Sequence, residues 1–116
     1  MQGINYAYVG AHAAQGENME ASTQTEIEAG VFRRLIAHLD DNKDVQNIDL
    51  MILADFCRNC LAKWYASEAK THGIDLDYEQ AREVVYKMPY SEWKANFQKP
   101  ASEAQLAALA ARQEKP

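Results

Sequence analysis

Apolar residues recur at helical spacing early in the chain, and the clearest stripe predicts a helix from about residue 23 to residue 41. The stripe consists of Ile27, Val31, Leu35 and Leu39. Hydroxyl and carboxylate side chains are spaced for a capping box at its start, either Thr23 with Glu26 or Thr25 with Glu28. We therefore expect the helix to begin at one of these threonines.

A second apolar stretch predicts one continuous helix from Asn47, a favourable N-cap, to about Thr71, with Gly73 in the left-handed position after it. One face carries Leu50, Leu53, Ala54, Cys57, Cys60, Leu61 and Trp64, and another carries Ile48, Ile52 and Phe56. A surface helix is not apolar nearly all round. We therefore expect this helix to lie in the middle of a bundle or against another subunit, with Trp64 buried.

Shorter helices are predicted in the second half. Asp77 and Gln80 form a capping box before a helix over about residues 78–88, which Pro89 ends, and another helix covers about residues 91–98. The alanine-rich residues 102–113 favour a last helix with Ser102 and Gln105 in capping positions. No alternating strand pattern is present. The sequence thus predicts an all-α bundle of four to five helices.

Composition places the chain among globular proteins. Its 116 residues, 47% of them hydrophobic and 25% charged, suffice for one domain. We divide it into a flexible N-terminal arm (1–20), a helical core domain (21–99) and an Ala-rich helical tail (100–116). The net charge of -5 and scattered basic residues disfavour binding to nucleic acid or to an anionic membrane. No membrane span or export signal is recognisable, so we expect a cytoplasmic protein.

The two cysteines of the chain stand three positions apart, in Cys57-Arg58-Asn59-Cys60, and this motif has three interpretations. The thiols pack in the core as small apolar groups, or they supply half of a tetrahedral zinc site. For zinc, His38 or His72 or a second copy of the motif would complete the ligands. The third interpretation is thiol redox chemistry, which the predicted helix disfavours because Cys57 lies inside it and not at a helix N-terminus.

A polar set along the same predicted helix is the other candidate site. It consists of Asp49, Asp55, Arg58, Asn59 and Lys63. Such sets are usually solvated faces; the functional alternative is a partly buried cluster that clamps helices or lines a pocket. The candidate interface consists of Ile48, Ile52, Phe56 and Trp64. The sequence identifies no catalytic residue, and zinc is the only cofactor that it suggests.

Several segments in order resemble a known family. They are Phe32-Arg33-Arg34-Leu35, the run from Asp44 to Met51, Phe56-Cys57-Arg58-Asn59-Cys60-Leu61, Lys63-Trp64-Tyr65 and the run from Met88 to Lys94. Over about residues 26–98 the chain resembles the bacterial domain-of-unknown-function family 1244. That resemblance implies a small multihelical fold, an intertwined homodimer and no assigned activity. We therefore expect a homodimeric interaction or regulatory module and not an enzyme, with a zinc or thiol-redox protein as the alternative.

Overall fold

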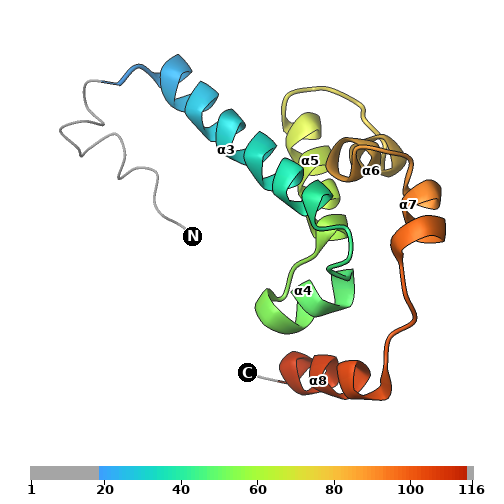
Figure 1. Cartoon of the computed structure of the whole chain (residues 1–116). Helices are drawn as coiled ribbons and strands as arrows, with labels where there is room; N and C mark the ends of the chain where they lie inside the picture. The colour runs from blue at the N-terminus through green and yellow to red at the C-terminus, as the bar shows by residue number, and fades with distance from the viewer. Residues whose placement is uncertain (1–18, 115–116) are drawn as a thin grey trace. The chain divides into compact units, whose positions relative to one another are not determined.

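The computed structural model describes residues 19–114, which form six helices and no strand (Figure 1). The helices are α3 (Ala21–Asp41), α4 (Asn47–Ala54), α5 (Arg58–Thr71), α6 (Tyr78–Tyr86), α7 (Tyr90–Phe97) and α8 (Glu103–Gln113). The predicted all-α class is confirmed, whereas the predicted number of four to five helices is too low. The arm predicted for residues 1–20 lies almost entirely outside the described residues. None of the described helices is long and apolar enough to cross a bilayer.

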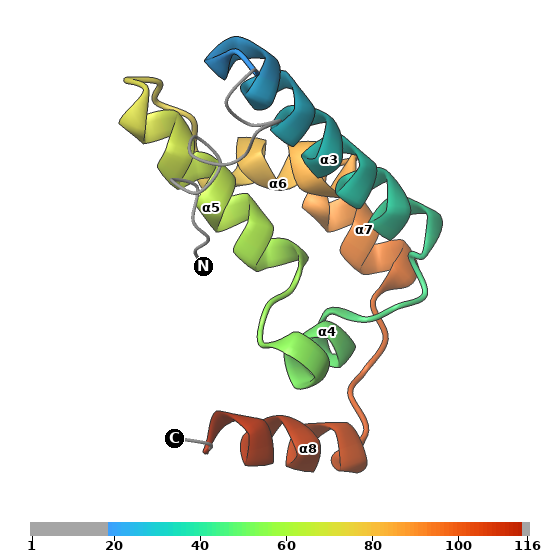
Figure 2. The same ribbon diagram turned by 90° about the vertical axis from the view of Figure 1, so that its left-hand side faces the viewer.

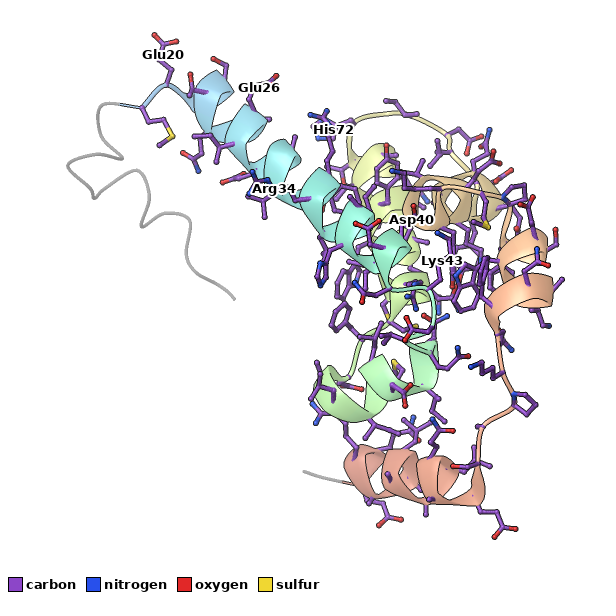
Figure 3. All side chains as sticks on the ribbon, viewed as in Figure 1. Glu20, Glu26, Arg34, Asp40, Lys43 and His72 are labelled. Carbon is purple, nitrogen blue, oxygen red and sulfur yellow. The ribbon has the colours of Figure 1, made fainter. Side chains whose placement is uncertain are left out.

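The described part of the chain divides into two compact units between Leu35 and Ile36, with the boundary inside α3. In the first unit α3 begins at Ala21, before both threonines that were predicted to cap it. The Thr25 hydroxyl donates to the Ala21 carbonyl at 3.0 Å, a bond within the helix. The predicted capping boxes of Thr23 and Thr25 are therefore wrong. In the second unit, Lys43 pairs with Asp40 at 2.9 Å where α3 ends (Figure 3).

The helix predicted over residues 47–71 is broken in the middle. Asp55 adopts a left-handed conformation (φ 60°, ψ 32°) and donates its N–H to the Met51 carbonyl at 3.0 Å, which ends α4. Cys57 is extended (φ −150°, ψ −176°) and is the N-cap of α5. Aspartate is among the few residues other than glycine that tolerate a positive φ. The apolar spacing continues across the break, so periodicity alone did not reveal it.

Other predicted helix ends agree better with the structure. Two predicted capping boxes are confirmed, Asp77 with Gln80 before α6 and Ser102 with Gln105 before α8. Gly73 has the expected positive φ, 76°. The N-cap of α4 is Gln46 and not Asn47, and the Gln46 N–H donates to the Asp49 carboxylate at 3.2 Å.

The buried core of the second unit lies where α5, α6 and α7 pack together (Figure 2). Ala62 of α5 and Ala81 of α6 are fully buried, and their small side chains let the two helices approach closely. The remaining buried apolar residues are Ile36, Leu39, Cys57, Leu61, Val85, Tyr86 and Trp93. The core is therefore small, and most of it comes from helices in the second half of the chain.

A second pair of helices, α4 and α8, packs side by side in the same unit (Figure 2). Neither of them contains a buried residue, although α4 is the most apolar of the described helices. Leu53 is 75% exposed, and on α5 Trp64 is 56% exposed. The prediction that Trp64 is buried is wrong, because the break at Asp55 changes which face of α5 meets the core.

Candidate functional site

Arg58, the first residue of α5, is almost fully buried and binds the turn that follows α3. Its Nη1 donates to the Val45 carbonyl at 2.8 Å, and its Nη2 donates to the carbonyls of Asn42 at 3.0 Å and Leu39 at 3.3 Å. These carbonyls lie at the negative end of α3, where a cation is favoured. The Leu39 and Asn42 carbonyls also accept from the backbone N–H groups of Asn42 and Val45, so the guanidinium adds a second, charged donor at the end of the helix.

The Arg58 guanidinium is buried without a carboxylate among its hydrogen-bond acceptors, which are all carbonyl and amide oxygens. One face of it lies against the Trp93 ring, 5.1 Å from the centroid. Burial lowers the pKa of Arg58, while the more distant Asp44 and Asp40 are among the groups that raise it. An arginine with a lowered pKa is still charged at neutral pH, so this buried cation is held by dipoles and an aromatic ring.

Asn47 connects Arg58 to Tyr86 of α6. The Asn47 Oδ1 accepts from the Arg58 Nη1 at 3.1 Å and from its backbone N–H at 3.3 Å, and the Asn47 Nδ2 donates to the Tyr86 hydroxyl at 3.0 Å. The same hydroxyl donates to the Asn59 Oδ1 at 2.7 Å. Burial raises the pKa of Tyr86 strongly, so the phenol is neutral and acts as donor and acceptor. We call Asn47, Arg58, Asn59, Tyr86 and Trp93 the Arg58 cluster.

The polar set predicted from the sequence is not one cluster. Arg58 and Asn59 belong to the Arg58 cluster, whereas Asp49 accepts from the Gln105 Nε2 of α8 at 2.9 Å. Asp55 and Lys63 are exposed. The difference arises because Asp55 stands in the break between α4 and α5, and the two helices point their polar residues in different directions.

Sequence reasoning missed Gln46, which is 7% exposed and joins two distant segments. Its Nε2 donates to the Phe97 carbonyl at 3.0 Å, and its Oε1 accepts from the Lys99 N–H at 2.8 Å. It also missed the roles of Tyr86 and Trp93, which read only as aromatic residues. The one available signal of a buried polar cluster was an arginine directly before an apolar helical face, because a buried arginine needs hydrogen-bond partners.

The two cysteines lie together at the start of α5, with Cys57 at the N-cap and Cys60 in the first turn. Cys57 is buried, and Cys60 is half-buried. Burial raises the pKa of Cys57, and the N–H groups of Cys60 and Asn59 oppose this by favouring the thiolate. The prediction that Cys57 lies inside a helix, away from free N–H groups, is therefore wrong.

The structure gives the metal interpretation no third ligand within residues 19–114, because no group of three or more His, Cys, Asp or Glu side chains is placed there to hold an ion. His38 and His72, the two imidazoles considered for zinc, are exposed, and His72 follows the far end of α5 (Figure 3). A zinc ion at Cys57 and Cys60 would need ligands from outside this range or from another chain.

The residues of the predicted interface lie on both sides of the break. Ile48 and Ile52 are half-buried on α4. Phe56 and Trp64 stack with ring centroids 6.4 Å apart and planes at 13°. The outer part of this aromatic pair faces solvent, since Trp64 is 56% exposed.

These features define a small helical protein that carries a buried arginine cluster beside a cysteine pair. A family model described as protein of unknown function (DUF1244) matches residues 45–111, more than half of the chain. The protein belongs to this family. The matched segment contains the whole Arg58 cluster and both cysteines, and it ends within α8. No curated protein matches the chain.

Proposed function

We propose that this protein is a homodimeric helical interaction module, not an enzyme, and that α4 with the adjoining Phe56–Trp64 pair forms the contact between two copies. The observation that carries the proposal is the exposure of α4. Six of its eight residues are apolar, and none of the eight is buried. We also place the module in the cytoplasm, since two cysteines in one short motif are not the disulfide framework of a small secreted domain.

The packing partner of α4 within the chain is too small to cover it. The sequence of α8 is dominated by alanine, and its larger Leu106 is 54% exposed. Removing one leucine or isoleucine side chain from water contributes about 1.5–3 kcal/mol. In α4, Leu53 is exposed and Ile48, Leu50, Met51 and Ile52 are half-buried, so their remaining exposed surface favours association. Exposed apolar patches on small proteins mark interaction surfaces.

The charges on α4 are compatible with a second copy of this chain as the partner. With a net charge of -5, two copies repel each other at long range, so a contact between them must not add like charges at its centre. The one charged residue of α4 is Asp49, and its carboxylate is already bound to the Gln105 side chain and the Gln46 N–H. The α4 helix itself therefore presents no free charge, and it can face its own copy across a two-fold axis.

The test is the oligomeric state of the full chain and of the Leu53→Asp variant, measured by size-exclusion chromatography with light scattering. Leu53 is 75% exposed, so the substitution removes little from the folded monomer. A carboxylate in an apolar contact costs several kcal/mol, and we expect the dimer to weaken about tenfold or more. The matched control is Ile74→Asp, since Ile74 is 56% exposed in the connection between α5 and α6.

The expected result is a dimeric parent chain, a dimeric Ile74→Asp variant and a monomeric, still helical Leu53→Asp variant. A monomeric parent chain at micromolar concentration would overturn the proposal. So would a Leu53→Asp variant that dimerises as tightly as the parent chain.

A further inference from the structure

We propose that Cys57 and Cys60 form a redox-responsive dithiol, which a low-molecular-weight disulfide oxidises to a disulfide within one chain. The two residues are the N-cap and a first-turn residue of α5, and the Cys60 N–H donates to the Cys57 carbonyl at 3.0 Å. A turn closed by this hydrogen bond holds its first and fourth Cα atoms less than about 7 Å apart, and a disulfide bridges Cα atoms about 4.4–6.8 Å apart.

Two features make the bridge compatible with the fold. Cys57 is extended and stands outside the helix, so its side chain can turn toward Cys60 without breaking the α5 backbone ladder. Both cysteines also stand at the same end of α5, Cys57 at the N-cap and Cys60 in the first turn. A pair at this position therefore needs no rearrangement of α5 to form the bond.

The difference in burial sets the order of the reaction. Cys60 is half-buried and Cys57 is 7% exposed, so an incoming disulfide reaches Cys60 first. The Cys60 thiolate attacks one sulfur of the reagent, which gives a mixed disulfide and releases one thiolate. The Cys57 thiolate then attacks the Cys60 sulfur and releases the second thiolate. The protein loses two electrons and two protons in total, and the reagent is reduced to two thiols.

The N–H groups of Asn59 and Cys60 favour the thiolate of Cys57 in the second step, while burial opposes it. Buried, uncharged thiols react slowly. We therefore expect a slow, reversible pair that senses the redox poise, and not a fast catalyst of disulfide exchange. Disulfides of this transient kind are the ones found in the cytosol.

The experiment incubates the full chain in mixtures of reduced and oxidised glutathione and follows free thiols and intact mass. We expect the parent chain to lose both thiols and two hydrogens per chain, and dithiothreitol to restore them. Cys57→Ser should accumulate the mixed disulfide with glutathione at Cys60. Cys60→Ser should react more slowly than Cys57→Ser, by a factor on the order of ten, because its remaining thiol is buried. Far-ultraviolet circular dichroism confirms that each variant is folded.

Three outcomes would overturn the inference. The parent chain could keep both thiols while Cys57→Ser forms the mixed disulfide, or the bond could join two chains, or bound zinc near stoichiometry could protect both thiols. The same reaction on the monomeric Leu53→Asp variant separates this inference from the proposed dimer. An intramolecular disulfide there supports the dithiol whatever the oligomeric state.

Discussion

The Arg58 cluster and the α4–α8 pair are adjacent parts of one folded unit, and they use their residues in opposite ways. Around Arg58, the buried guanidinium and two half-buried amides, Asn47 and Asn59, pack with the buried Tyr86 and Trp93. In the α4–α8 pair, isoleucine, leucine and methionine side chains remain partly exposed. The apolar content of a helix thus does not decide its burial in this protein.

The Arg58 cluster and the α4–α8 pair differ in whether the chain itself supplies all of their packing and hydrogen-bond partners. The Arg58 cluster satisfies its buried polar groups with partners from α3, α4, α5 and α6, so it needs nothing from outside. The α4–α8 pair has a capping box and the Asp49–Gln105 hydrogen bond, but no buried residue. Our proposal assigns the missing cover of α4 to a second copy of the chain.

The largest expected effect compares the two tryptophans. Trp93 is 1% exposed and contacts Tyr86 and Arg58, so Trp93→Ala should lower the free energy of unfolding by about 3–5 kcal/mol. Trp64 is 56% exposed and stacks on Phe56, so Trp64→Ala should cost about 0.5–1.5 kcal/mol. Urea unfolding of both variants in the Leu53→Asp background, which we expect to be monomeric, measures both losses without the dimer contact. Equal losses would mean that Trp64 is as well packed as Trp93, which would contradict the comparison.

Next in size is the effect of removing the Arg58 guanidinium. Arg58→Met keeps an apolar stem but leaves the carbonyls of Leu39, Asn42 and Val45 without this donor. The Leu39 and Asn42 carbonyls keep one backbone donor each. A hydrogen bond to a charged group contributes about 1.5–3 kcal/mol, and partial access to water reduces the sum, so we expect a loss of about 3 kcal/mol. The control is Lys63→Met on the same helix, where the side chain is exposed and the change should stay within about 0.5 kcal/mol.

The Arg58 prediction fails if Arg58→Met unfolds at the same urea concentration as Lys63→Met. A further variant, Arg58→Lys, keeps the charge but not the planar fork, and one ammonium cannot serve acceptors on both sides. It should therefore recover only part of the loss.

A smaller effect is expected from the Tyr86 hydroxyl. Tyr86→Phe keeps the ring and removes the group that accepts from Asn47 and donates to Asn59, so we expect a loss of about 1–2 kcal/mol. The control is Tyr90→Phe, whose hydroxyl donates to the exposed Gln98 at 3.2 Å. Thermal unfolding should rank the two variants in this order, and the reverse order would show that the Tyr86 hydroxyl is not a structural link.

The smallest expected effect is a pH dependence of the difference in stability between the parent chain and Tyr86→Phe. Burial raises the pKa of Tyr86 in the folded state, so above pH about 10 the unfolded chain loses the phenol proton first. The stability contributed by the neutral phenol is present below that pH and is lost as pH rises through the folded pKa. The advantage of the parent chain over Tyr86→Phe should therefore shrink above pH about 10. A constant advantage up to pH 11 would contradict the raised pKa.

Helix type and most helix ends were predictable because they depend on neighbouring residues. Apolar spacing placed α3, capping residues and Pro89 placed α6, and alanine content with a capping box placed α8, each within a few residues. The boxes of Asp77 with Gln80 and Ser102 with Gln105 are local hydrogen bonds. The break at Asp55 was not predictable in this way. Its left-handed backbone has a local cost, and the contacts that Arg58 makes after the break stabilise it.

The sequence by itself determined that this protein is all-helical, that it belongs with a family of unknown function, and that its chemically distinctive residues are concentrated near residue 58. The tertiary structure alone decided which of these residues are buried together. Asn47, Arg58 and Tyr86 come from three helices, and their hydrogen bonds span up to 39 positions in the chain. Local periodicity carries no information about such distant partners, because it records only which residues share a face of one helix.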